Sequence, residues 1–330
     1  MLTGGPRGGT TTALLLGAIV AGGLLGALAP DLGTVLAGGV DPSILLLVGA
    51  LFFTLRLDGI RSLRRSPRTM LLALGMNFLL IPPIAIALTL LLPGEALRLG
   101  VLIYCLAPCT DWFLGFTRLA GGDTTTGAAL IPVQLTLQLA LYPLWLALFA
   151  GRHVEATAAQ AVPALLTWFA LPAVVGLATR LVVHAAIPRR RRDRTVDAVG
   201  RGIPLIVAAL IVCLFAGNVR AILADPASFA GVLVVVFLFF AVAYVLGEAM
   251  SRLARLRPAE HVLLTMTTSA RNAPLMLAVT TVALPGQPVV YAGIVLGMLI
   301  EFPHLTALAH LLRRRRPRAR HPGRAASPVT

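Results

Sequence analysis

Apolar runs of about 20 residues recur along the whole chain, and each could cross the ~30 Å hydrocarbon core of a bilayer as a helix. The composition agrees with this pattern. Of the 330 residues, 58% are hydrophobic and 12% are charged, about half the charged fraction of a soluble domain. The sequence therefore predicts an all-α polytopic membrane protein, with one transmembrane domain over residues 1–315 and no separate soluble domain.

The apolar pattern predicts ten transmembrane helices. Their approximate bounds are 12–29, 43–60, 69–93, 97–117, 124–150, 160–186, 203–222, 228–250, 261–284 and 288–312. They form two repeats of five, 12–150 and 160–312. An odd number of helices per repeat makes the two repeats inverted relative to the membrane. The remaining residues, 316–330, are predicted to be a basic, disordered cytoplasmic tail.

The arginines predict the orientation of the chain. The formal net charge is +15, and with ten helices the basic clusters fall in loops on one side. These clusters are Arg56 to Arg68, Arg118, Arg189 to Arg194, Arg252 to Arg257 and Arg313 to Arg316. The opposite loops carry only Arg98, Arg152 and Arg220. The positive-inside rule then places both termini in the cytoplasm and the protein in the cell membrane. The basic run at 313–320 is interpreted as a lipid-facing anchor rather than a nucleic-acid patch.

Two predicted helices contain a break at corresponding places in the two repeats. The fourth reads CLAPCTDW at 105–112, and the ninth reads SARNAP at 269–274. Pro108 and Pro274 each remove a backbone donor and free a carbonyl, which hydrocarbon tolerates only beside protein or a wet cavity. Such paired breaks indicate the binding site of a transporter, although a simple proline kink is the alternative. We expect the discontinuous fourth and ninth helices to cross at these breaks.

Asp111, Arg271 and Glu301 are the ionisable residues deepest in the predicted helices. A charge at the bilayer centre costs about 2.5–3.5 kcal/mol on insertion scales, so each is a candidate functional residue. Glu301 could carry a proton at ambient pH, because burial favours the neutral form of a carboxyl group. The alternative is a structural ion pair that joins Arg271 to Asp111 or to Glu301.

Neutral and sulfur-bearing side chains complete the candidate site. Cys109 directly follows the proline of the first break, and a thiol suits a soft centre such as trivalent arsenic. Cys105 and Cys213 are interpreted as ordinary small membrane residues. Gln134 and Asn272 could bond the hydroxyl groups of a solute, although for Gln134 the favoured interpretation is a hydrogen bond that joins helices. The sequence shows no metal-ligand motif, so we expect no metal, no cofactor and no catalytic residues.

Three segments carry a resemblance to a known family. LAPCTDWFLGFTRLAGGD at 106–123 resembles the fourth helix of arsenite-efflux permeases, the arsenical resistance proteins. IPVQLTLQLALYPLW at 131–145 and GIVLGMLIEFPHLTAL at 293–308 resemble their fifth and tenth helices. The chain is more distantly similar to the bile acid:sodium symporters of the same bile acid/arsenite/riboflavin transporter superfamily. The resemblance implies a ten-helix inverted repeat with a panel and a core. It also implies that Cys109 is the thiol contact and Glu301 the proton-linked carboxylate.

The ninth helix departs from both groups. It reads TTSARNAPLMLAV at 267–279. Arg271 aligns with a glutamine, and Thr267 with a glutamate, that help to coordinate sodium in the symporters. A guanidinium at a sodium position repels sodium and supplies the positive charge itself. We therefore expect coupling to protons rather than to sodium.

The sequence predicts a secondary transporter, not an enzyme, and most favours a proton-coupled antiporter that exports arsenite or a related metalloid oxyanion. In this hypothesis Cys109 contacts the metalloid, and Asp111, Asn272 and Gln134 bond its hydroxyls. Arg271 offsets negative charge, and Glu301 exchanges the proton. The alternative is a sodium- or proton-coupled transporter of an organic anion. In either case the expected partners are a small anionic or metalloid solute, a coupling ion and the lipid bilayer, with no nucleic acid.

Overall fold

The structure is a computed structural model that describes residues 8–54, 66–110, 112–149 and 170–314. Within these ranges every regular element is a helix, apart from one isolated bridge, so the predicted all-α class is confirmed. In chain order the elements are α1 (Gly8–Leu28), α2 (Pro30–Ala37), α3 (Val40–Thr54), α4 (Pro67–Gly75), the π-helix η2 (Met76–Leu80), α5 (Ile81–Thr89), α6 (Glu95–Leu106), α7 (Phe113–Leu119), α8 (Thr124–Phe149), α10 (Leu171–Ala186), α11 (Arg189–Ala224), α12 (Pro226–Leu253), α13 (Pro258–Ser269), α14 (Ala273–Ala283) and α15 (Pro288–Arg314).

Many of these helices suit a membrane. Among the described residues, six helical stretches are long and apolar enough to span a bilayer, and three shorter helices are also apolar. The predicted fourth and ninth spans are each divided into two helices, α6 with α7 and α13 with α14. The first part of the predicted sixth span, together with the predicted tail, lies outside the described residues. The count of ten and the inverted repeat therefore stay predictions.

Two helical stretches begin before the spans predicted for them. The second span was predicted to begin at residue 43, but helix already starts at Pro30, whose fixed φ suits a first helical turn. The seventh was predicted to begin at residue 203, but α11 starts at Arg189 and includes the arginine run at 189–194. Arginine is a good helix former, and exposed guanidinium groups do not prevent a helix from extending beyond its apolar part.

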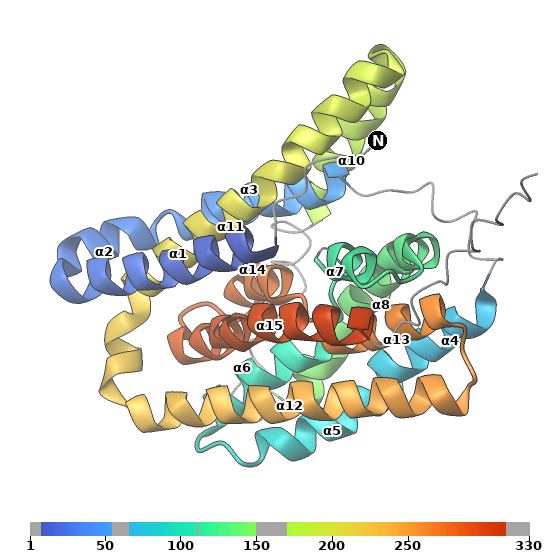
Figure 1. Cartoon of the computed structure of the whole chain (residues 1–330). Coiled ribbons are helices and arrows are strands. Elements are labelled where there is room, and N and C mark those ends of the chain that lie inside the picture. The colour runs from blue at the N-terminus through green and yellow to red at the C-terminus, as the bar shows by residue number, and fades with distance from the viewer. Residues whose placement is uncertain (1–7, 55–65, 111, 150–169, 315–330) are drawn as a thin grey trace, which may run out of the picture.

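The helices pack into two groups (Figure 1). The panel group consists of α1, α2, α3, α10 and α11, in which α11 packs along α1, α2 and α3, and α10 packs on α3. The core group consists of α4 to α8 and α12 to α15, in which α12 packs on α13 and α15, and α15 packs on α6. The groups meet mainly where α11 and α1 contact α15.

Glycines bring the panel helices into close contact. A Cβ atom on Gly22 would lie 2.6 Å from the Val212 carbonyl oxygen, and one on Gly33 would lie 2.6 Å from that of Ala216. Neither position can accept a larger residue without a backbone shift. Small residues of this kind let membrane helices approach closely, where packing rather than the hydrophobic effect drives their association.

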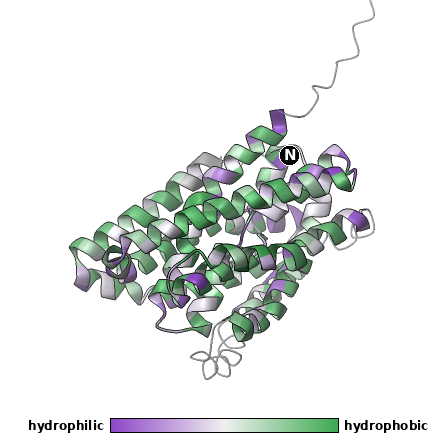
Figure 2. Cartoon of the chain, turned by 90° about the horizontal axis from the view of Figure 1, so that it is seen from below, coloured by the Kyte–Doolittle hydropathy of each residue, from purple (hydrophilic) through white to green (hydrophobic). Residues whose placement is uncertain are grey.

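The outer faces of the helices are apolar. Large side chains such as Val35, Leu79 and Leu253 are exposed, and hydrophobic residues predominate along the helices in the view from below (Figure 2). In contrast, many polar side chains of the core group are buried, among them Asn77, Gln134, Arg271, Asn272 and Glu301. An apolar exterior around a polar centre is the arrangement expected of a protein that moves a polar solute through lipid.

Candidate functional site

The two breaks meet at the centre of the core group. Between α6 and α7, the Cys109 N–H donates to the Ala270 carbonyl oxygen at 3.1 Å. Between α13 and α14, the Asn272 N–H donates to the Ala107 carbonyl oxygen at 2.9 Å. These two bonds flank an antiparallel bridge between Pro108 and Arg271. The unwound segments therefore satisfy part of each other's backbone, as non-helical backbone at membrane depth requires.

Local sequence explains where each break begins and ends. Ala107 is extended (φ −100°, ψ 101°), which is the conformation that a following proline favours. In the second break Asn272 caps α14, because its side-chain oxygen accepts from the Leu275 N–H at 3.2 Å. Pro108 lies within the first break, whereas Pro274 lies in the first turn of α14. At that place a proline costs no hydrogen bond.

Arg271 is completely buried at the crossing. Its Nη1 donates to the Cys105 carbonyl oxygen at 3.0 Å, and its Nη2 donates to Asn77 Oδ1 at 2.8 Å and to the Thr268 carbonyl oxygen. Its Cζ lies 5.3 Å from the centre of the Phe239 ring, within cation–π range. We name these three acceptors the oxygen cage. The cage holds the guanidinium as a fixed internal cation.

Glu301 of α15 lies at the same crossing and is 1% exposed. Its Oε1 accepts from the Arg271 backbone N–H at 2.9 Å, and its Oε2 accepts from the Tyr104 hydroxyl at 3.1 Å. The Tyr104 hydroxyl also lies 3.1 Å from the Gly297 carbonyl oxygen. A Cβ on Gly297 would come within 2.6 Å of the Tyr104 ring, so glycine makes room for that ring. The carboxylate thus takes up the one backbone donor that the bridge leaves unpaired at Arg271.

A third interruption brings Asn77 to the cage. The π-helix η2 (Met76–Leu80) contains Asn77 and precedes Pro82, which lacks the N–H needed to continue an α-helical ladder. Such π turns are frequent at functional sites. From the sequence, Asn77 could bond a solute or join helices, with no place at the crossing assigned to it, and Tyr104 was not singled out. The consecutive prolines Pro82 and Pro83 were the available signal for a third interruption.

Neutral side chains add a second polar layer. Asn272 Nδ2 donates to Thr110 Oγ1 at 2.7 Å, which joins the two breaks directly. Gln134 Nε2 of α8 donates to Thr267 Oγ1 of α13 at 3.0 Å. All four side chains are buried. The arrangement offers uncharged donors and acceptors next to the fixed cation.

The three cysteines lie in two different places. Cys109 is in the first break and Cys105 in the last turn of α6, and both are buried, whereas Cys213 belongs to α11 of the panel group. Among the described residues no cluster of three or more His, Cys, Asp or Glu side chains could hold a metal ion. Cys109 is the thiol within the first break, and Cys105, whose carbonyl oxygen belongs to the oxygen cage, lies beside the crossing.

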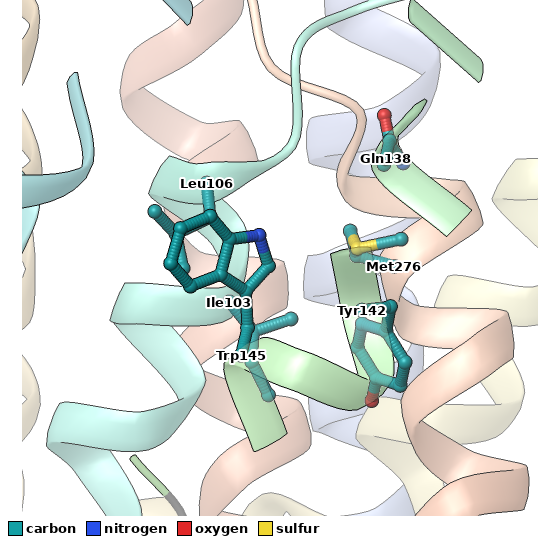
Figure 3. A pocket seen from close by; sticks show the side chains of 6 residues that line it. All are labelled: Ile103, Leu106, Gln138, Tyr142, Trp145 and Met276. Atoms are coloured by element: carbon teal, nitrogen blue, oxygen red, sulfur yellow. The ribbon is translucent and has the colours of Figure 1, made fainter. Parts of the chain in front are cut away.

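A small hollow adjoins the crossing (Figure 3). It lies between α6, α8 and α14 and is lined by Ile103, Leu106, Gln138, Tyr142, Trp145 and Met276. The Gln138 amide is buried and makes no hydrogen bond, while Tyr142 donates to Thr280 Oγ1 at 3.0 Å. The hollow is mainly apolar, with one unsatisfied amide.

The structure brings together most of the residues singled out from the sequence. Cys109, Arg271, Asn272 and Glu301 meet at the crossing, and Gln134 contacts Thr267, which lies five residues before Asn272 in the chain. Asp111 lies outside the described residues. The contact between Arg271 and Glu301 runs through the backbone N–H of Arg271.

Comparison with known families gives one match. A family model described as the sodium bile acid symporter family matches residues 42–246, which is more than half of the chain. No curated protein matches the chain. The match agrees with the broader part of the resemblance seen in the sequence, and nothing in it singles out the arsenite permeases.

Proposed function

Because the chain belongs to the sodium bile acid symporter family, we propose that it is a proton-coupled secondary transporter that exports arsenite or a related trivalent metalloid oxyanion. Membership makes it a multi-pass membrane transporter and not an enzyme. The proposal includes ten transmembrane helices in two inverted repeats, with both termini in the cytoplasm.

The oxygen cage around Arg271 carries the proposal. Two carbonyl oxygens and one amide oxygen converge there at mid-core, and oxygen ligands of this kind are those that a hard cation prefers. The guanidinium fills the cage with a permanent positive charge, since arginine is not deprotonated in proteins. A sodium ion at that place would meet both steric exclusion and charge repulsion. We infer that this member of the family does not couple transport to sodium.

Glu301 is then the group that can bind and release the coupling ion. In the charged form it accepts from the Tyr104 hydroxyl and from the Arg271 N–H. When the carboxyl group binds a proton at Oε2, that oxygen becomes a donor and no longer needs the Tyr104 hydrogen. Tyr104 can turn its hydrogen to the Gly297 carbonyl oxygen, which is already within reach. One proton can therefore enter or leave the crossing without leaving a buried hydrogen-bond donor unpaired.

The other polar groups suit a small neutral hydroxide. A trivalent metalloid hydroxide presents hydroxyl groups and a soft centre, and the first break offers the Cys109 thiol, with the neutral pairs Asn272–Thr110 and Gln134–Thr267 nearby. A single thiol gives weak, reversible contact, which a transporter needs in order to release its cargo. Asp111 is a further proposed hydroxyl contact from the sequence. Since Cys109 is completely buried, we propose that the cargo reaches it when the panel and core groups move relative to each other.

The experiment is arsenite accumulation in a bacterium that lacks its own efflux systems. Cells that express the wild-type protein should accumulate less arsenite than cells that express Cys109→Ser, with equal amounts of both proteins in the membrane. Cys213→Ser is the matched control, because that thiol lies in the panel group, and it should behave as the wild type does. Equal accumulation with wild type and Cys109→Ser would remove arsenite as the cargo.

The hollow beside the crossing favours a second candidate, an organic anion with an apolar body. Ile103, Leu106 and Met276 could receive the apolar part, and the free Gln138 amide could donate to a carboxylate. Arg271 would act at a distance, because its terminal nitrogens are engaged in the cage. Uptake of labelled organic acids by cells that express the wild type, lost in Gln138→Leu, would support this candidate.

A further inference from the structure

Several buried polar atoms that make no hydrogen bond lie along α12. They are in the half of the core group that includes the arginine-rich loop between α12 and α13. Among the described residues, Trp112 Nε1 and the Gln138 amide make no hydrogen bond, and neither do five further buried side-chain atoms: Ser251 Oγ, Thr265 Oγ1, Ser269 Oγ, Arg271 Nε and His304 Nε2. These five belong to three different helices, α12, α13 and α15, or to the break between α13 and α14. Their common neighbour is α12, which packs on both α13 and α15.

Their contacts place them in order along α12. At the level of the crossing, the Arg271 Cζ lies 5.3 Å from the centre of the Phe239 ring, and the His304 ring stacks on Phe240 at 4.8 Å. Further along, a Cβ on Gly247 would lie 3.3 Å from Thr265 Oγ1. Ser251 lies one helical turn beyond Gly247 on α12. From Phe239 to Ser251 the helix rises about 18 Å.

Ser269 fills the interval on α13. It lies four residues after Thr265, and residues at this spacing share one face of a helix. Both hydroxyls are completely buried. The unpartnered atoms therefore form a row from the crossing toward the loop that joins α12 to α13. Gly247 lets the α12 backbone pack closely against this row, because a Cβ there would lie 3.0 Å from the Thr265 Cα.

The row is unusual because buried serines and threonines normally donate to a carbonyl in the preceding turn. Thr117 of α7 does so, with its Oγ1 2.7 Å from the Phe113 carbonyl oxygen. An unsatisfied buried polar group destabilises a protein, so several in a row would remove much of its net stability. Ordered waters are the usual partners of such groups. Water molecules bound along α12 would supply the missing partners.

Both ends of the row carry ionisable groups. At the crossing Glu301 lies one turn before His304 on α15, and its other neighbours are Tyr104 and Arg271. At the far end Glu248 of α12 is buried, with its Oε1 2.5 Å from His261 Nε2 and its Oε2 3.0 Å from Arg252 Nη2. The Arg252 side chain is 70% exposed, so this end reaches the surface of the protein.

We propose that a file of water molecules and hydroxyls along α12 carries protons between the Glu248–His261 pair and Glu301. This inference rests on the proposed proton coupling at Glu301 and adds the route by which the proton travels. Each water or hydroxyl accepts one proton and donates another, so a proton enters at one end and another leaves at the other with no net change between them. Thr265 and Ser269 are positioning residues, because they hold the waters in line.

The test follows the protonation of Glu301 after a rapid pH drop in the purified full-length protein, without any substrate. The infrared band of the protonated carboxyl is assigned by its loss in Glu301→Gln. We expect Thr265→Val, which keeps the side-chain shape but removes the hydroxyl, to slow the rise of this band about tenfold, which corresponds to about 1.4 kcal/mol of barrier. Thr117→Val is the matched control, because its hydroxyl is satisfied within its own helix, and it should leave the rate unchanged.

Thermal stability gives a second readout. If waters satisfy Thr265, its replacement by valine removes their partner and lowers or preserves the melting temperature. If the row is dry, valine relieves an unsatisfied hydroxyl and raises the melting temperature. A higher melting temperature with an unchanged rate overturns the proposal and leaves proton coupling intact. Should Thr265→Val fail to fold, Ser269→Ala is measured in the same way.

One further outcome separates this inference from the proposed function. If the wild-type protein shows no Glu301 band over the whole pH range, Glu301 does not take up protons. The proposed coupling then fails, and the file fails with it because it has no proton acceptor at the crossing.

Discussion

The two breaks solve the same backbone problem with different chemistry. At the first break Pro108 has no N–H, so this residue of the antiparallel bridge has no backbone donor that needs a partner. The neighbouring side chain is the neutral thiol of Cys109. In the second, Arg271 has an N–H that the bridge does not use, and the Glu301 carboxylate accepts it. An ionisable carboxyl group therefore satisfies the backbone at the second break. We infer that the second break serves the coupling ion and the first break serves the cargo.

A substitution at Glu301 should separate the roles of the two breaks most clearly. Glu301→Gln keeps an acceptor for the Arg271 N–H but cannot bind and release a proton, so we expect it to abolish proton-driven transport. Cargo should still exchange across the membrane without a gradient. Counterflow of labelled arsenite in proteoliposomes, compared with net transport driven by a proton gradient, measures the two activities separately. Equal loss of both would mean that Glu301 serves cargo binding as well, and the division between the breaks would be wrong.

Arg271 is expected to have the next largest effect. Arg271→Gln removes a buried cation from its acceptors and should destabilise the protein by about 3–5 kcal/mol. It also empties the oxygen cage, so sodium should raise the melting temperature of the variant and leave that of the wild type unchanged. Arg98→Gln is the control, because Arg98 donates only to the Leu92 carbonyl oxygen near a helix end. A variant that sodium does not stabilise would show that the cage is not a cation site.

Cys109→Ser tests the first break alone. Serine keeps the size and the backbone bond to Ala270 but replaces a soft ligand with a hard one. We expect the apparent affinity for arsenite to fall about tenfold, equivalent to about 1.4 kcal/mol, with the proton dependence of transport unchanged. Transport at graded arsenite concentrations and two pH values measures both. An altered proton dependence would mean that the two breaks do not act separately.

Asn272 joins the breaks, and its effect should be the smallest. Asn272→Ala removes the cap of α14 and the bond to Thr110, and the loss of a helix cap costs about 1 kcal/mol. Asn272→Ser is the matched variant, because serine can still cap α14 but is too short to reach Thr110. Thermal unfolding of the two variants separates the cap from the bridge. If Asn272→Ser is as unstable as Asn272→Ala, the bond between the breaks dominates.

The sequence predicted much of this arrangement, because its strongest signals are local. Apolar length predicted helices, and the proline at 108 with the polar run at 269–272 predicted where two of them break. The partners of Arg271 could not be predicted, since two of the three cage acceptors are backbone oxygens that carry no side-chain signature. Tyr104 was missed, and the place of Asn77 in the cage was not predicted, because an asparagine or tyrosine in an apolar helix gives no sign of which helix it faces. The row of unsatisfied polar atoms along α12 could not be predicted either, because it depends on how the helices pack.

The most direct test of the central claim is to compare coupling ions in proteoliposomes that contain the wild-type protein. Arsenite transport is driven either by a proton gradient in sodium-free buffer or by a sodium gradient at equal pH on both sides. Because Arg271 fills the cage where a sodium ion could sit, we predict transport under the proton gradient and none above background under the sodium gradient. Transport that requires sodium and ignores the proton gradient would contradict the account.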